Sequence, residues 1–174
     1  MVRKISGIIL AIIFFLIQTC FGTVISLGDI KPNLLIILVF SWGFINGKKS
    51  GLYMGFFCGL LMDSFFGYEG ILGFTALIYM YIGFINGIFH EVFYGEDIKF
   101  PLALVAISDF LYNFIYYLIV FLLRNKLDIA FYLKRIIIPE VIYTTILTII
   151  IYRFLFILCK KINNIEKKNE GKYV

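Results

Sequence analysis

Residues 43–67 read GFINGKKSGLYMGFFCGLLMDSFFG, and this stretch decides how the rest of the chain is interpreted. Glycine recurs at every fourth position from 43 to 59, and the same spacing then reaches Asp63. In an α-helix, residues four apart lie on one face, so Gly51, Gly55 and Gly59 predict a groove without side chains. In lipid, close van der Waals approach replaces the hydrophobic effect as the main force between helices. We therefore predict that this face is a helix-packing or partner interface that ends on a carboxylate.

The composition is that of a polytopic membrane protein. Of 174 residues, 61% are hydrophobic and 16% charged, whereas soluble domains are about half apolar and about a quarter charged. The net charge is +5, but the basic residues gather at segment ends and in the C-terminal tail. That distribution is typical of topology signals and contacts with membrane lipids, so we expect no nucleic-acid partner. The three cysteines lack metal-ligand spacing, and we expect no metal or cofactor.

Hydropathy predicts an all-α protein of six transmembrane helices, at residues 5–27, 34–47, 51–66, 71–89, 100–123 and 136–159. All three prolines stand at segment starts, where the missing N–H is not needed. The second segment is short for a span. A re-entrant hairpin of the second and third segments is the alternative, but it would bury Lys48 and Lys49 in the membrane. Two short spans are therefore favoured.

The loops predict the orientation. Residues 1–162 are expected to form one transmembrane domain, followed by a short basic cytoplasmic tail at 163–174. With the N-terminus inside, ten Lys and Arg residues lie on the cytoplasmic side and five outside. The positive-inside rule therefore predicts that both termini are cytoplasmic. No small-x-small cleavage site follows the first apolar run, so we interpret it as a retained helix.

Charged and polar residues inside apolar segments are expensive and usually functional. In the six-helix arrangement, Asp109 and Arg153 lie at depths that differ by only about 5 Å, so an ion pair between antiparallel helices is feasible. Asn113, one turn from Asp109, would share this buried polar network. A structural pair that fixes helix register is favoured over an ion site of the transport type.

A second polar group is predicted at the outer ends of the helices. Lys31, Glu69 and Glu140 would form an outer rim there, near Asp63, that binds a partner's extracytoplasmic stem or is solvated. For Glu140 the simpler interpretation is favoured, because an acidic residue suits the first turn of a helix.

Catalytic motifs are missing from the sequence, which contains no P-loop, GxSxG, HExxH or CxxC pattern. The only histidine, His90, stands at a segment end without Cys or His companions. We predict that the protein is not an enzyme.

A series of residues from position 32 to position 87 forms one pattern: Pro32-Asn33-Leu34-Leu35, Gly43, the glycine series that ends in Gly-Leu-Leu-x-Asp63, Gly70-x2-Gly73, and Gly83 with Gly87. Together these residues resemble the rod shape-determining protein MreD family. In that family a Pro-Asp/Asn pair opens the second helix, and a glycine-rich third helix ends in Gly-Leu-x-x-Asp. The last two segments match by hydropathy alone.

The resemblance implies a bacterial inner-membrane subunit of the cell-elongation machinery, which acts in cell-wall peptidoglycan synthesis without catalysis. It implies MreC as partner and, through MreC, the MreB cytoskeleton and the RodA/penicillin-binding-protein synthase. It also implies a fold similar to the substrate-binding membrane subunits of energy-coupling-factor vitamin transporters. The alternative function is such a transporter subunit, which six helices and the Asp109, Asn113 and Arg153 centre would suit.

Overall fold

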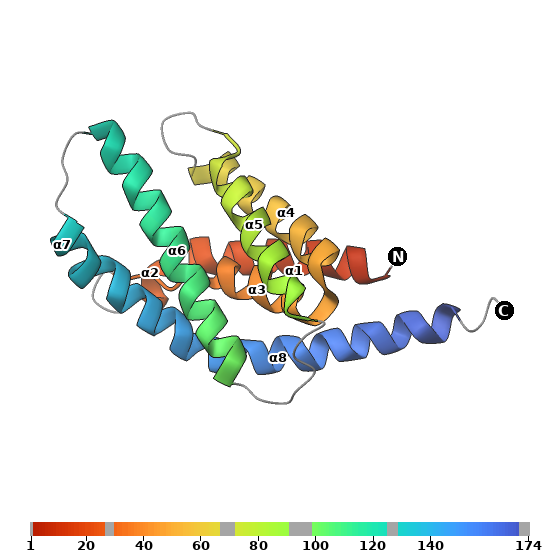
Figure 1. Cartoon of the computed structure of the whole chain (residues 1–174). Coiled ribbons are helices and arrows are strands. Elements are labelled where there is room, and N and C mark those ends of the chain that lie inside the picture. Colours follow the sequence, from red (N-terminus) through yellow and green to blue (C-terminus); the bar gives the residue numbers. More distant parts are fainter. Residues whose placement is uncertain (1, 27–29, 67–71, 91–98, 125–128, 171–174) are drawn as a thin grey trace.

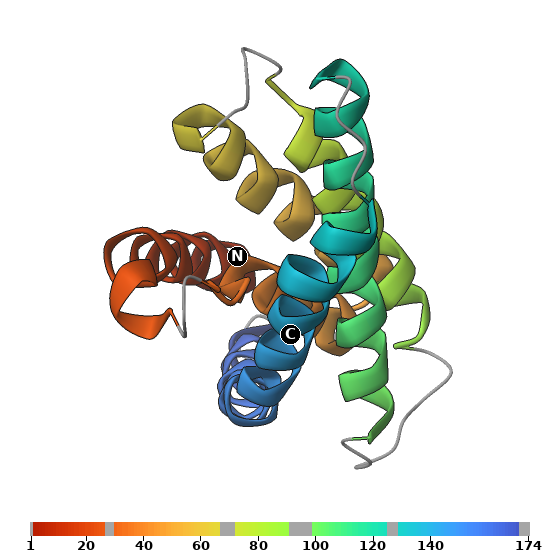
Figure 2. The ribbon, with the colours of Figure 1, turned by 90° about the vertical axis from the view of Figure 1, so that its left-hand side faces the viewer.

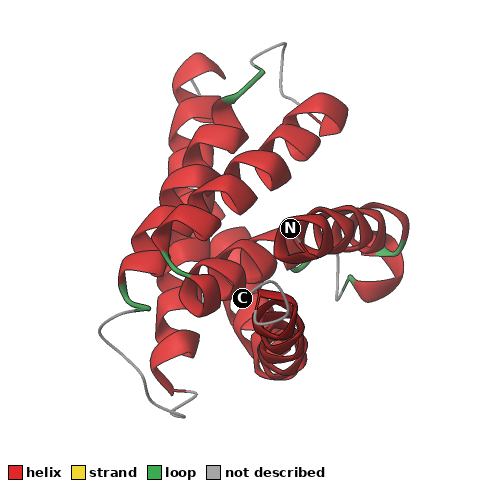
Figure 3. Ribbon diagram, turned by 90° about the vertical axis from the view of Figure 1, so that its right-hand side faces the viewer, coloured by secondary structure: helices red, strands yellow, loops and turns green. Residues whose placement is uncertain are grey.

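The described part of the chain is helical throughout. The computed structural model describes residues 2–26, 30–66, 72–90, 99–124 and 129–170, and Figure 3 shows these residues as helices joined by short loops. Six of the helices have thirteen or more residues, which confirms the all-α, six-helix prediction. They are α1 (Val2–Cys20), α3 (Leu34–Asn46), α4 (Lys48–Phe66), α5 (Phe74–Ile88), α6 (Lys99–Arg124) and α8 (Ile138–Glu170) (Figure 1).

Three stretches are long and apolar enough to cross a membrane, namely Arg3–Cys20, Lys99–Ile119 and Leu133–Glu166. The short helix α2 (Gly22–Ile25) follows α1, and α7 (Ile129–Tyr132) leads through the π-helical turn η2 (Leu133–Ile137) into α8. The chain is therefore a polytopic membrane protein whose remaining apolar helices, α3 and α5, are shorter.

Helix α3 is the centre of the molecule. It is buried from Leu34 to Phe44, and a helix that is apolar all round belongs in a protein interior. Its 13 residues reach only about 20 Å, less than the ~30 Å hydrocarbon core. Because neighbouring helices surround it, α3 need not match the lipid thickness by itself. Figure 2 shows α1, α4, α6 and α8 on different sides of this centre.

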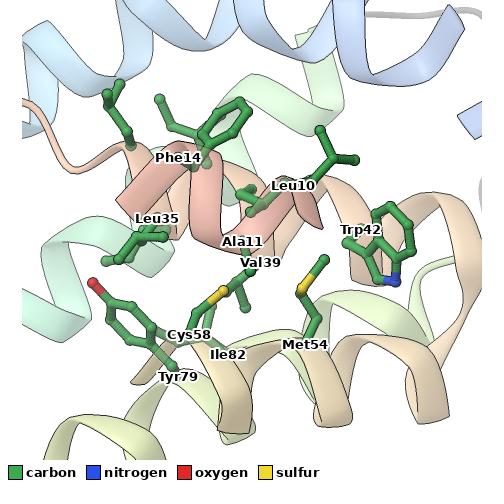
Figure 4. Close-up of a cluster of buried hydrophobic side chains, with 14 of the residues drawn as sticks. Leu10, Ala11, Phe14, Leu35, Val39, Trp42, Met54, Cys58, Tyr79 and Ile82 are labelled. Atoms are coloured by element: carbon green, nitrogen blue, oxygen red, sulfur yellow. The ribbon is translucent and has the colours of Figure 1, made fainter. Parts of the chain in front are cut away.

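The hydrophobic core lies where α1 and the α4–α5 pair meet α3. Figure 4 shows side chains from α1 above α3 and from α4 and α5 below it. Those drawn include Leu10 and Phe14 of α1, Val39 of α3, Cys58 of α4 and Ile82 of α5. All five are buried, so α1 packs against the other helices of the core.

Two helix boundaries differ from the sequence prediction. The break between α3 and α4 is the single residue Gly47, whose φ of +85° favours glycine. Lys48 and Lys49, expected in the break, are instead the first residues of α4. At the other end of the chain, α8 continues to Glu170, so the helix crosses the predicted domain boundary after residue 162 without interruption.

The start of α1 and the end of α8 lie on the same side of the molecule (Figure 1). Glu166 lies beside Arg3, and the amide of Asn163 donates to the side-chain oxygen of Asn46 at 3.4 Å, which brings the end of α3 to this side as well. Exposed basic residues here include Lys4, Lys48, Lys49, Lys160 and Lys161. Those exposed at the opposite side are Lys31, Lys134 and Arg135. Cytoplasmic placement of the richer side stays a prediction.

Candidate functional site

The glycine face of α4 packs against α5 inside the same chain. A Cβ atom at Gly51 would overlap the carbonyl of Gly83, and one at Gly55 would overlap the carbonyl of Tyr79. At Gly59 the obstacle is the backbone of Ala76. Each contact is with main chain, which side-chain movement cannot relieve. The groove predicted from the four-residue spacing is thus filled by α5 of the same chain.

Asp63 holds the first turn of α5. Its Oδ2 accepts from the N–H groups of Gly73 and Ala76, both at 3.0 Å, and its Oδ1 accepts from Thr75 N–H at 3.2 Å. Gly73 adopts a φ of +103° as the N-cap residue, which turns the chain so that these donors face the carboxylate. A negative charge at a helix N-terminus is also favourable electrostatically. The buried Asp63 side chain is therefore occupied within the fold and is not the exposed docking acid that we expected.

A second set of polar contacts joins α3, α5 and α8. The Asn33 side-chain oxygen accepts from Ile36 N–H at 3.2 Å, which caps α3, and from the Tyr79 hydroxyl at 3.0 Å. The Asn33 N–H donates to Thr144 Oγ1 of α8 at 3.2 Å. All of these groups are buried, and pairing is what makes buried polar groups tolerable.

Asp109 of α6 lies next to this set. It is fully buried, and its Oδ1 accepts a long 3.4 Å hydrogen bond from Asn113. Thr144 lies beside its carboxyl group, and the half-buried Glu140 lies beside both Asn113 and Asp109. The second oxygen, Oδ2, has no hydrogen-bond partner in the described part of the chain. The result is a cluster of two acidic side chains at the crossing of α6 and α8.

The structure brings Asp109 and Asn113 together as predicted, but it places Arg153 elsewhere. Arg153 is exposed on α8, and no salt bridge joins these two described residues. The predicted ion pair is therefore absent, and Glu140 takes the place expected for Arg153. The reason is both axial and rotational. Asp109 lies beside Thr144, and Arg153 is nine residues farther along α8, or about 13 Å and two and a half helical turns.

The predicted outer rim also changes. Lys31 is exposed as expected, whereas Glu140 turns toward Asp109. Glu69 lies outside the described residues. Sequence reasoning missed Tyr79 and Thr144 as polar contacts, and a tyrosine or threonine in an apolar helix carries no pattern that marks it.

The ring of His90 meets the end of α3, where its Nδ1 lies 2.7 Å from the Phe44 carbonyl oxygen. Among residues 2–26, 30–66, 72–90, 99–124 and 129–170, no three His, Cys, Asp or Glu side chains gather as a metal-ligand group. The chemistry of the cluster is therefore that of hydroxyls, amides and two carboxyl groups.

Comparison with known families identifies the chain. The family model described as rod shape-determining protein MreD matches residues 2–162, so the chain belongs to the MreD family, and the resemblance seen in the sequence is confirmed. No curated protein and no solved structure matches the chain. Family membership gives the chain a role in rod shape determination as a membrane protein.

Proposed function

We propose that this protein is a non-enzymatic scaffold of the bacterial cell-elongation machinery that binds a single-span, coiled-coil protein of the MreC type. The observation that carries the proposal is the family match over residues 2–162. Through this partner the scaffold would connect to the MreB cytoskeleton and to the RodA/penicillin-binding-protein synthase. We place it in the inner membrane, with both termini in the cytoplasm.

The use of the polar groups supports a scaffold. The Asp63 carboxylate accepts hydrogen bonds from three backbone N–H groups. The Asn33 side-chain oxygen accepts one from the Ile36 N–H, which caps α3, and one from the Tyr79 hydroxyl. Such contacts fix the relative positions of helices, which is what a scaffold needs. Partner binding is then left to the outer surfaces of α1, α6 and α8, in whose candidate spans only 28%, 28% and 22% of the residues are buried.

The basic end of the molecule supports the proposed orientation. Exposed lysines at the starts of α1 and α4 and near the end of α8 would face the cytoplasm and its anionic lipids. Labelling of single cysteines at positions 4 and 161 in intact cells and in inverted vesicles tests this point. Accessibility from outside intact cells would reverse the orientation.

Capture of the partner tests the proposed function. The full chain is co-expressed with the MreC-type protein of the same bacterium and purified through a tag in mild detergent. We expect a stoichiometric complex and no capture of an unrelated single-span protein with a segment of equal length. Depletion of the chain from rod-shaped cells should round them. A wild-type chain that captures no MreC-type protein would contradict the proposal.

A second candidate function is a substrate-binding subunit of a vitamin transporter. The observation that favours it is the buried Asp109 oxygen without a hydrogen-bond partner in the described residues, because a bound molecule with a donor group would satisfy it. Mass spectrometry of the purified protein distinguishes the two functions. A stoichiometric vitamin that is lost in Asp109→Ala would favour the transporter.

A further inference from the structure

Arg153 stands on the outer surface of a membrane-spanning helix. It lies within the apolar stretch Leu133–Glu166 of α8, and its side chain is exposed. The large side chains exposed around it are apolar; they are Ile149, Ile150, Phe154, Phe156 and Ile157. A guanidinium group in such a setting faces hydrocarbon unless another molecule covers it, and charge in that environment is costly.

The position of Arg153 along α8 keeps it from the membrane surface. It is seven residues from Lys160 and nineteen from Lys134, or about 10 Å and about 28 Å at ~1.5 Å per residue. Its Cα–Cβ bond tilts toward the helix N-terminus, which is away from the nearer basic end. Arginine near a helix end can reach lipid headgroups, but here the side chain starts toward the middle of the span.

This chain offers Arg153 no acidic partner in its described residues. Asp109 and Asp63 are buried on other helices, Glu140 lies beside Asp109, and Glu166 lies beside Arg3. In a second copy of the chain, Asp63 and Asp109 would be buried in the same way. None of the acids in the described residues is placed to neutralise Arg153, so a carboxylate of a different protein could take this role.

We propose that the Arg153 face of α8 receives a transmembrane helix of another protein, and that this helix carries an Asp or Glu side chain at the depth of Arg153. A carboxylate can accept two parallel N–H bonds from a guanidinium group, and the surrounding isoleucines and phenylalanines supply apolar contact. This inference rests on the proposed function, because the single transmembrane segment of the MreC-type protein is the occupant to which we commit.

Capture of the MreC-type protein by variants of the full chain tests the inference. We expect Arg153→Leu to reduce capture by about tenfold, which corresponds to one strong interhelical polar contact, and Arg153→Lys to reduce it less. Lys160→Leu is the matched control, because it removes one exposed positive charge from the same helix, two turns nearer its C-terminus. It should leave capture unchanged. The thermal midpoint of the chain alone, in detergent, should not fall in Arg153→Leu.

The possible results separate this inference from the proposed function. If Arg153→Leu captures the MreC-type protein as well as the wild-type chain does, the inference is overturned. The proposed function is still upheld in that case, because the wild-type chain forms the complex. A wild-type chain that captures nothing defeats the proposed function itself. A lower midpoint in Arg153→Leu, or an altered oligomeric state of the chain alone, would show an internal or self-association role and overturn the inference. Restored capture when Arg153→Glu meets a partner whose acid is replaced by Lys would establish the pair.

Discussion

The contact of α4 with α5 and the crossing of α6 with α8 are built in opposite ways. In the first, glycines bring two backbones together and Asp63 locks the turn through three backbone N–H groups. In the second, side chains meet across the gap, and the contacts around Asp109 are long or incomplete. In the first contact neither backbone can move away without losing these interactions, whereas in the second, one Asp109 oxygen has no hydrogen-bond partner in the described residues.

The two contacts should therefore contribute differently to the stability of the protein. Close backbone packing with a satisfied carboxylate suits the rigid part of a membrane scaffold. An incompletely satisfied acidic cluster is a poor source of stability, because buried charge gains little unless it is well paired. We therefore expect substitutions in the α4–α5 contact to cost most, and substitutions around Asp109 to cost least.

The largest effect should come from Gly55→Ala. Alanine favours a helix over glycine by about 1 kcal/mol, yet the added Cβ would overlap the Tyr79 carbonyl. We expect the free energy of unfolding in detergent to fall by more than about 3 kcal/mol, as for other severe packing faults. Gly22→Ala is the control, since its Cβ would lie 3.8 Å from a lysine carbon. If Gly55→Ala stabilises the protein, the two backbones are not in close contact.

Asp63→Ala should have the second largest effect on stability. It removes the acceptor for three buried or half-buried N–H groups and the charge at the α5 N-terminus, so we expect a loss of about 2–3 kcal/mol. Asp63→Asn should lose less, because the amide keeps one acceptor oxygen. The neighbouring Ser64→Ala serves as control, since Ser64 is exposed and bonds only to its own helix. An Asp63→Ala protein with normal stability but no partner capture would return Asp63 to a docking role.

Tyr79→Phe should have a smaller effect. It removes the hydroxyl that donates to Asn33 but leaves the Ile36 N–H bond to the same oxygen. We expect a loss of about 1 kcal/mol, the usual net contribution of one hydrogen bond. Tyr81→Phe, at an exposed position on the same helix, should change the stability little. An equal loss in both variants would mean that the hydrogen bond to Asn33 does not contribute.

The sequence could predict the α4–α5 contact because its signal is periodic. Glycines four apart specify both a helix and the face it presents, so residues 51, 55 and 59 could be placed together without knowledge of the partner helix. The prediction for Arg153 failed because its depth was counted from a helix end that the sequence does not fix. In the structure Asp109 lies beside Thr144, and Arg153 is about 13 Å farther along α8 and on another face of that helix.

The role of Asp63 shows a different limit. The sequence marked it as the end of the glycine face, but its three hydrogen-bond donors belong to backbone ten to thirteen residues later. Backbone N–H groups have no residue identity, so no motif in the sequence could name them. A family resemblance could point to Asp63 as important without revealing that its use is internal.

The smallest effect is expected for the coupling energy between Asp109 and Arg153. A double-mutant cycle of Asp109→Asn and Arg153→Leu should give a coupling energy within about 0.5 kcal/mol of zero, as expected for residues without contact. The cycle of Asp109→Asn with Thr144→Val is the positive control, because these side chains lie next to each other. Exchange of the two charges should likewise fail to recover stability lost in either single variant. A coupling above about 1 kcal/mol in the first cycle would show that Asp109 and Arg153 interact after all. Arg153 would then have a partner inside the chain, and the argument for an acid from another protein would fail.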